Sequence, residues 1–405
     1  MLRAIHIANY RSLGDDVSLV LPQGDRSLTV LAGLNGSGKS NALDAVRFLG
    51  DVFRQGLDVA LRARRGVAAL RRRGAEEVRL AVEAEGEIGR VVWGLSLSLD
   101  PQGHELSAEW ATLIPPDQIA HFEATLRDVA LARKGRGDDA DRTSVLAEAL
   151  RWKMDAGDGL RPMPFQGAAV FRPLGPAGPM ILPGLPRGGA FLRDLLQRVA
   201  VYTLHPPDLR EPQEPRLHAP MDGSGADWMS ALRALDRAGL RDDFRVMMAK
   251  LVPDLVDYRV HEVSDVLITE FVHAGGGGET WALNTRHESD GTLRCAALLA
   301  ALLQDPLPSL LCIEEPELAL HVGALPVLVD QILATASLTP VILTTHSPDV
   351  IDLVPADSVR VVERGPHGTA LRAVDGRQRR VVRDHLATMG TLLREEGLQA
   401  EGSVG

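Results

Sequence analysis

The sequence predicts an α/β fold organised around one phosphate-binding loop, and three observations support this. A glycine-rich loop of the form G-x-x-x-x-G-K-[ST] runs from Gly33 to Ser40. An apolar run at 28–32 precedes it as a buried strand, and apolar residues at helical spacing follow it over 41–53. Two further apolar runs, 309–313 and 341–344, end in ionisable side chains, as strands do at the ligand edge of an α/β sheet.

The loop has the residue types that a bound triphosphate needs. Backbone N–H groups of a glycine-rich turn can converge on an anion, and the first turn of the next helix adds the positive end of its dipole. Lys39 would reach the β- and γ-phosphates, and the Ser40 hydroxyl would ligate the bridging Mg²⁺ of a Mg-ATP complex. The other loop residues predicted to contact the nucleotide are Asn35, Gly36, Ser37, Gly38 and Asn41.

Composition is that of an ordinary globular protein. The chain has 405 residues, 45% hydrophobic and 24% charged, which is enough for a large core or two lobes. A formal net charge of −10 means that any DNA contact needs a local basic face. Cys295 and Cys312 lie in apolar runs without metal spacing, which indicates buried thiols in a reducing compartment. No run reaches the roughly 18 apolar residues of a membrane span, so we expect a cytoplasmic protein.

Apolar periodicity predicts strands and helices in both halves of the chain. The predicted strands are 2–9, 17–21, 28–32, several within 77–112, 200–204, 257–263, 265–273, 281–283, 309–313 and 341–344. The predicted helices are 41–53, a second one to about Leu70, several within 119–155, 191–199, 228–252 and 293–303. A charged loop is expected at 134–139, a Pro/Gly-rich loop rather than a core element at 161–189, and a hairpin tip at 275–278. No heptad run is long enough for a coiled coil.

The densest basic cluster lies in the second predicted helix and just after it. Its members are Arg62, Arg64, Arg65, Arg71, Arg72 and Arg73. Such a cluster can bind the phosphate backbone of DNA. A solvated helix face that balances nearby acids is the favoured interpretation, because no aromatic residues are interleaved for stacking on bases.

A second group of candidate residues follows the later two strands. Glu314 could hold Mg²⁺ through water, and Glu315 could orient and deprotonate an attacking water molecule. His346 ends the strand that should lie beside theirs, so it could hydrogen-bond a γ-phosphate. The alternatives are an acidic surface turn and a structural histidine, and the glycine-rich loop makes both less favoured.

Residues 288–292, Glu-Ser-Asp-Gly-Thr, place free N–H groups at the start of another helix. One nucleotide needs only one helix start of this kind for its phosphates, so a second one suggests that residues 288–292 bind the nucleotide of another subunit. Taken alone, the motif is also a good helix N-cap.

The order of these motifs resembles the RecF/SMC-like branch of the ABC-class ATPases, and more narrowly the stand-alone bacterial AAA family predicted ATPases that are related to the OLD nucleases. The likeness rests on Asn-Tyr-Arg-Ser, the loop followed by Asn41, Ser-Asp-Gly-Thr-Leu-Arg, Cys-Ile-Glu-Glu-Pro-Glu, Leu-His and Thr-Thr-His-Ser-Pro. It covers about 1–50 and 285–365. It implies a P-loop NTPase fold, an ABC-ATPase head with a mixed central sheet, N-terminal antiparallel strands, a helical insertion and no coiled coil.

The resemblance implies roles for single residues. The loop would be the Walker A motif, Glu314 the Walker B acid with glutamate in place of aspartate, and Glu315 the catalytic glutamate. Lys39 and His346 would take part in catalysis together with Glu315, and His346 would be the switch histidine. Arg11 would contact phosphate or adenine.

Other positions match the parts of the family that face a second subunit. Ser289 and Gly291 stand where the signature residues touch the γ-phosphate of the other subunit, and Glu317 to His321 fall at the D-loop. Two departures stand out. Val322 replaces the usual proline after Leu-His, and no glutamine follows Leu204 to mark a Q-loop.

The resemblance implies an ATPase that converts ATP and water to ADP and phosphate, with ATP joining two heads into a homodimer. DNA maintenance, repair or antiviral defence is the expected setting, with DNA and a separate nuclease or effector subunit as expected partners. No D-x-D follows His346, so nuclease activity in this chain is not expected. The alternatives are the ATPase subunit of a membrane transporter and a non-hydrolysing nucleotide-gated scaffold. The expected divisions are an ATPase lobe at 1–115, an insertion at 116–199, a helical subdomain with strands at 200–284 and a second ATPase lobe at 285–405.

Overall fold

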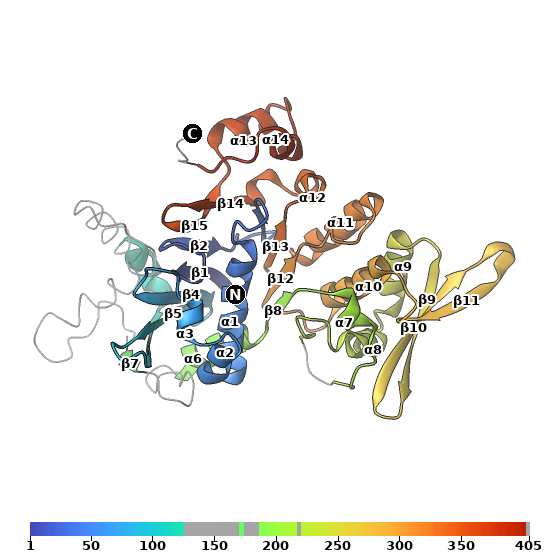
Figure 1. The fold of residues 1–405 in the computed structure, drawn as a ribbon, viewed down its shortest axis with the longest axis horizontal. Coiled ribbons are helices and arrows are strands. Elements are labelled where there is room, and N and C mark those ends of the chain that lie inside the picture. The colour runs from blue at the N-terminus through green and yellow to red at the C-terminus, as the bar shows by residue number, and fades with distance from the viewer. Residues whose placement is uncertain (125–169, 174–185, 217–219, 402–405) are drawn as a thin grey trace, which may run out of the picture. The chain divides into compact units, whose positions relative to one another are not determined.

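The computed structural model describes residues 1–124, 170–173, 186–216 and 220–401, whose elements are labelled in Figure 1. The chain forms two compact units, each assembled from three stretches. Unit 1 comprises Met1–Leu21, Leu34–Gln197 and Val362–Arg372, and unit 2 comprises Pro22–Gly33, Arg198–Val361 and Ala373–Gly405. The glycine-rich loop therefore begins in unit 2 with Gly33 and continues in unit 1 from Leu34.

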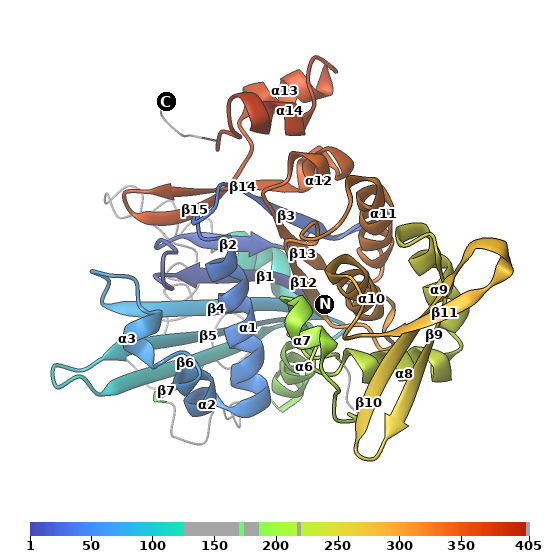
Figure 2. The same ribbon diagram turned by 45° about the vertical axis from the view of Figure 1, so that its right-hand side comes forward.

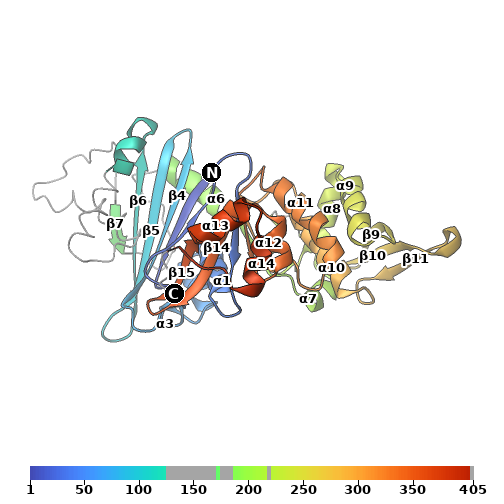
Figure 3. The ribbon, with the colours of Figure 1, turned by 90° about the horizontal axis from the view of Figure 1, so that it is seen from above.

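Unit 1 contains an antiparallel sheet, which confirms the antiparallel N-terminal strands predicted from the sequence. Its strand order is β2-β1-β4-β5-β6-β7, and each neighbouring pair is antiparallel. Figure 3 shows β4, β5 and β6 lying side by side. The strands are β1 (Leu2–Ala8), β2 (Val17–Val20), β4 (Glu77–Gly86), β5 (Gly89–Leu99), β6 (Glu105–Ile114) and β7 (Val170–Pro173).

The helix after the loop, α1 (Lys39–Gln55), packs on this sheet through its apolar face. The Phe53 ring meets the Trp93 ring of β5 edge-on, with centroids 5.1 Å apart. The second predicted helix is divided into α2 (Leu57–Arg62) and α3 (Val67–Leu70). Arg65 and Gly66 cause the break, because both have positive φ, 66° and 81°, which a continuing helix excludes.

The central sheet of unit 2 is parallel, as expected for an α/β sheet whose strands are connected through helices. Its strand order is β14-β3-β13-β12-β8, and each neighbouring pair is parallel. Beyond Val361, β14 runs on into unit 1, where β15 follows it after two residues; so short a connection makes that pair antiparallel and the whole sheet mixed. The strands are β3 (Leu28–Ala32), β8 (Val199–Tyr202), β12 (Leu310–Glu314), β13 (Val341–Thr345), β14 (Val359–Gly365) and β15 (Gly368–Ala373).

The most buried helix of unit 2 is α10 (Asp290–Leu303), which packs against four other helices (Figure 2). Those helices are α7 (Pro206–Arg210), α8 (Trp228–Ala238), α9 (Arg241–Leu251) and α11 (Leu325–Thr335). The segment predicted to be helical over 228–252 is two helices, because Gly239 ends α8 in the left-handed conformation with φ 77°. Cys295 and Cys312 are buried free thiols, as predicted, and burial raises the pKa of Cys295 to about 12.

The remaining elements of unit 2 are a small sheet and the C-terminal helices. The sheet has the order β11-β10-β9, and the predicted glycine-rich tip at 275–278 separates two of its strands. Its strands are β9 (Leu255–Val263), β10 (Val266–Ala274) and β11 (Thr280–Asn284), and the helices are α12 (Pro348–Leu353), α13 (Gly376–Arg383) and α14 (Met389–Glu395). Among the described residues, we find no helix with the length and apolar character needed to cross a bilayer.

The predicted insertion at 116–199 falls largely outside the described residues. Residues 119–124 are helical, but the rest of the helices predicted to 155 and the charged loop at 134–139 are not described. The prediction of a loop at 161–189 is wrong at both described places. Residues 170–173 form β7, which pairs with β6, and residues from Pro186 onward form α6 (Pro186–Gln197).

The predicted basic cluster includes one arginine that is a structural residue of unit 1. The Arg64 side chain is 6% exposed, and its guanidinium lies 3.2 Å from Asp44 Oδ1 and 2.9 Å from Asp51 Oδ2. The Tyr10 hydroxyl donates to the other oxygen of Asp44, at 2.6 Å. Both aspartates lie on α1, so Arg64 ties the α2–α3 turn to the helix that follows the glycine-rich loop. This ion-pair network accounts for Arg64 without nucleic acid.

We expect Arg64→Ala to lower the free energy of unfolding by about 2 kcal/mol, because a buried cation that bridges two half-buried carboxylates is lost, although Arg11 still pairs with Asp44 and Arg54 with Asp51. The exposed Arg62 is a matched control, and Arg62→Ala should change stability by less than about 0.5 kcal/mol. Urea unfolding followed by circular dichroism measures both. Equal stability of the two variants would contradict the structural role of Arg64.

Candidate nucleotide-binding site

The part of the loop that lies in unit 1 is tightly curled and begins α1. Gly36 and Gly38 have φ of 76° and 115°, conformations that favour glycine. Ser37 N–H donates to the Leu34 carbonyl at 3.1 Å, and the buried Lys39 reaches the same carbonyl with Nζ at 3.1 Å. Gly38 is the N-cap of α1 and supplies no capping side chain, so the N-terminal N–H groups of the helix lack a side-chain cap.

Some of the residues predicted to contact the nucleotide are exposed, and others contact the protein. Asn35, Gly36 and Ser40 are exposed. Arg11, which has φ 52°, forms an ion pair with Asp44, and its Nη2 lies 3.0 Å from Oδ2; the Arg11 side chain stays 36% exposed. Asn41 differs from these, because its amide donates to Ser12 Oγ at 2.8 Å. In this structure, Asn41 therefore binds another part of the chain.

Unit 2 collects the predicted carboxylates and histidine at the C-terminal edge of its sheet. The register pairs Glu314 with Thr344, and Thr345 with Ala32. Glu314 accepts a hydrogen bond from Thr203 Oγ1 at 2.9 Å. Glu315 follows in the left-handed region with φ 45°, and its Oε1 lies 3.2 Å from His346 Nδ1. The prediction that the strand before His346 lies beside the strand before Glu315 is thus confirmed.

Two residues to which the sequence analysis gave no role at the carboxylate edge hold this arrangement. Glu317 Oε1 accepts from the Thr345 hydroxyl at 2.5 Å and from His346 N–H at 3.3 Å, and the Glu317 side chain is 8% exposed. Arg294 of α10, also buried, donates to the Glu315 carbonyl at 2.9 Å and to the Leu204 carbonyl at 2.6 Å. Burial lowers the pKa of Arg294. The only sequence signal for these residues was their place within matched motifs.

The start of α10 has the cap that its sequence predicts. Ser289 Oγ accepts from Thr292 N–H at 3.0 Å, and Ser289 itself is exposed. Arg210 secures the preceding turn by donating to the carbonyls of Thr285, Arg286 and Glu288. A Cβ on Gly291 would lie 2.7 Å from the Ala319 carbonyl oxygen. The signature segment therefore contacts the segment predicted to be the D-loop.

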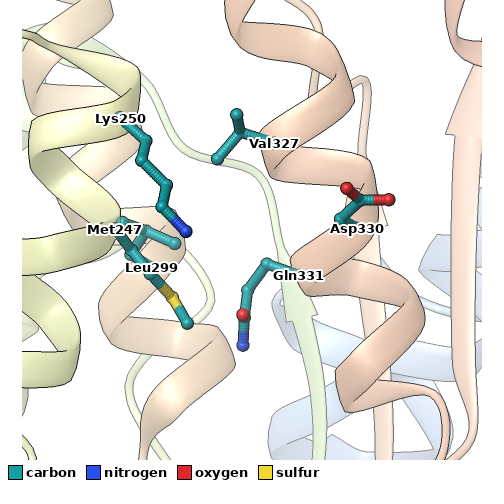
Figure 4. A pocket seen from close by; sticks show the side chains of 6 residues that line it. All are labelled: Met247, Lys250, Leu299, Val327, Asp330 and Gln331. Atoms are coloured by element: carbon teal, nitrogen blue, oxygen red, sulfur yellow. The ribbon is translucent and has the colours of Figure 1, made fainter.

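Among the described residues, neither a cluster of metal ligands nor the pocket coincides with the motif residues. Within the described ranges, no group of three or more His, Cys, Asp and Glu side chains is arranged to hold a metal ion. A pocket of about 170 Å³ lies among α9, α10 and α11 (Figure 4). It contains none of the residues predicted from the motifs, and we assign it no role. Its lining residues are Met247, Lys250, Leu299, Val327, Asp330 and Gln331.

We expect Gly291→Ala to destabilise the protein by about 1–3 kcal/mol, because its methyl group needs backbone to move. Gly376 is the matched control: it opens α13, and no atom lies within 4 Å of a Cβ placed on it. Gly376→Ala should keep wild-type stability or gain up to about 1 kcal/mol. Thermal unfolding of both variants tests the contact, and a Gly291→Ala protein as stable as the control would argue against it.

Comparison with solved structures supports the fold. An Smc head domain in complex with the C-winged helix domain of ScpA matches with a TM-score of 0.53 at 16% identity, over 93% of this chain and 99% of that one. The Smc head domain of Thermotoga maritima matches at 13% identity and a TM-score of 0.44, over 92% and 99%. That of Pyrococcus yayanosii, with a coiled coil and joint, gives 12% and 0.49, over 95% and 99%. Only the first score is high enough to support a common fold, that of a P-loop ATPase head. The described residues contain no long coiled coil.

No curated protein matches the chain. A family does match, and its description reads "AAA domain, putative AbiEii toxin, Type IV TA system". The match takes in residues 28–129 and 196–352, so it includes the glycine-rich loop, the signature segment, both carboxylates and His346. Because this is well over half of the sequence, the chain belongs to that family of AAA domains.

Proposed function

We propose that the protein binds and hydrolyses ATP, and that ATP joins two copies of it. One observation carries the proposal: within unit 2, three parallel strands end at the same edge of the sheet. Two of them end at Glu314–Glu315 and at Thr345–His346. The third, β3, ends at Ala32, which pairs with Thr345 and leads directly into Gly33 of the loop. Chain continuity thus starts the loop where the carboxylates and the histidine gather.

The residues at this edge have the chemistry of phosphoryl transfer to water. Glu315 is the proposed base, and its contact with His346 directs its carboxylate toward the end of β13. Lys39 supplies a positive charge to the β- and γ-phosphates, and His346 a hydrogen bond to the γ-phosphate. Mg²⁺ prefers oxygen ligands and keeps several waters, so the exposed Ser40 hydroxyl and the Glu314 carboxylate suit it. Bound Mg²⁺ would neutralise charge that develops on the phosphates.

The exposed Ser289 supports the homodimer, because a capped helix start that faces solvent can accept the γ-phosphate of a second copy. DNA maintenance, repair or antiviral defence remains the proposed setting, with a separate nuclease or effector subunit as partner and the cytoplasm as location. These rest on the family resemblance. A non-hydrolysing scaffold or a transporter subunit would use the same fold.

Lys39→Ala should abolish ATP binding, because it removes the cation that the motif directs at the phosphates. Isothermal titration with Mg-ATP gives the affinity, and Lys250→Ala serves as control, since Lys250 is exposed on α9. Wild-type affinity in Lys39→Ala would refute the assignment of the loop.

Glu315→Gln should slow hydrolysis by roughly 10²- to 10⁴-fold, because glutamine keeps the side-chain shape but cannot accept the proton. ATP should still bind. Phosphate release by the wild type, by Glu315→Gln and by the exposed control Glu395→Gln measures the effect. Hydrolysis by Glu315→Gln at the wild-type rate would exclude Glu315 as the base, and an inactive wild type would favour the scaffold.

The slowed variant should also accumulate as an ATP-bound dimer, because ATP then remains bound between the two copies. Light scattering with saturating Mg-ATP reports its mass. Adding Ser289→Arg should return Glu315→Gln to the monomer with nucleotide still bound. A Glu315→Gln protein that stays monomeric would contradict the nucleotide-joined dimer.

A further inference from the structure

Three segments of unit 1 that are far apart in the sequence meet at Gly38. They are the turn after β1, the glycine-rich loop with the start of α1, and the hairpin strand β15. Thr369 of β15 is fully buried, and its Oγ1 lies 2.7 Å from the Ser37 carbonyl oxygen and 3.1 Å from Ser12 Oγ. Ser12 Oγ in turn accepts from the Asn41 amide at 2.8 Å. A chain of hydrogen bonds thus links α1 to the loop peptide that precedes Gly38.

The shorter of the two hydrogen bonds that Thr369 can donate is the one to the loop. The Ser37 carbonyl can only accept, so the single hydroxyl proton of Thr369 goes to it. Ser12 Oγ is the second, more distant acceptor of Thr369, at 3.1 Å, and it also accepts from the Asn41 amide. Each hydrogen bond in such a chain polarises the next.

The chain fixes the orientation of one peptide group of the loop. In a trans peptide the carbonyl and the following N–H point in opposite directions, so holding the Ser37 carbonyl on Thr369 turns the Gly38 N–H away from Thr369. Gly38 itself has φ 115°, and a Cβ there would lie 2.6 Å from Thr369 Oγ1 and 2.8 Å from Ser12 Oγ. The hydroxyls thus occupy the space that any side chain at position 38 would need.

The main chain of β15 is held independently of the hydroxyl. Thr369 N–H donates to the Ser12 carbonyl at 2.7 Å, and the Thr369 carbonyl accepts from Gly14 N–H at 2.9 Å. Removing only the hydroxyl therefore leaves the hairpin attached to the turn. The role of the side chain can be separated from the fold.

We propose that Thr369 is a positioning residue for nucleotide binding: its hydroxyl, itself in contact with Ser12, holds the Ser37–Gly38 peptide with its N–H turned to the phosphates. The proposal rests on the proposed function of the loop. Without the hydroxyl, the Ser37–Gly38 peptide would populate both orientations. The apparent Kd for Mg-ATP would then rise in proportion to the loss of the orientation that binds phosphate.

Thr369→Val removes the hydroxyl at nearly constant shape. We expect the Kd for Mg-ATP, measured by isothermal titration with the full chain, to rise roughly 3- to 10-fold, the equivalent of one hydrogen bond. Thr369→Ser keeps the hydroxyl and should restore affinity to near the wild-type value. Thr112 is the matched control, since it is a buried threonine of unit 1 whose hydroxyl meets no partner among the described residues. Thr112→Val should bind Mg-ATP as the wild type does.

If Thr369→Val does not fold, a second variant tests the chain of hydrogen bonds. Ser12→Ala removes the middle member and should raise the Kd by a similar factor. The double variant Ser12→Ala/Thr369→Val should bind no more weakly than the worse single one, because both changes break one chain.

The outcomes separate this inference from the proposed function. A wild-type protein that does not bind Mg-ATP would overturn both. Binding by the wild type, with an unchanged Kd in Thr369→Val and Ser12→Ala, would overturn the positioning role alone. Failure of Thr369→Ser to restore affinity, or an equal loss in Thr112→Val, would also overturn it, because either would assign the effect to packing.

Discussion

Parallel pairing of β3, β13 and β12 is the constraint on which the candidate site depends. Parallel strands end at a common edge, so the pairing alone gathers residues from three distant parts of the sequence. The register is specific: Thr345 lies opposite Ala32, and Glu314 opposite Thr344. A slip of one residue would turn every side chain of a strand to the other face of the sheet. The buried apolar residues of β13 and β12 therefore also fix which way the polar residues point.

The left-handed conformation of Glu315 is a second constraint on the candidate site. A residue other than glycine with positive φ costs of order 1–3 kcal/mol unless its surroundings hold it. Here Glu315 N–H donates to the Thr344 carbonyl at 3.0 Å, and the Glu315 carbonyl accepts from the buried Arg294. Strand pairing and helix α10 thus share the task of directing one carboxylate. A change in α10 that moves Arg294 can therefore displace Glu315.

The sequence predicted most of this framework, for identifiable reasons. Strands such as β3 and β13 are short apolar runs bounded by polar residues, and a period of two or a continuous run identifies them well. The residues predicted to lie at strand ends do so, because they directly follow the apolar runs in the motifs. The boundaries that failed depend on single conformations: Arg65 and Gly239 break helices by adopting positive φ, and nothing in the periodicity marks them. Arg64 and Thr369 act through tertiary contacts with residues distant in the sequence, which no local pattern encodes.

The strand β14 has a consequence for synthesis of the protein. Its first residues, Val359–Val361, pair with β3, which was made more than 300 residues earlier, and its continuation leads to the hairpin that touches the loop. Each unit is drawn from three separated stretches of chain. Domains generally fold as units while the chain leaves the ribosome, but here neither unit has all its strands until β14 and β15 have emerged. Until then, β3 and the glycine-rich loop lack the neighbours that shape them, and the nascent chain cannot form this loop geometry early.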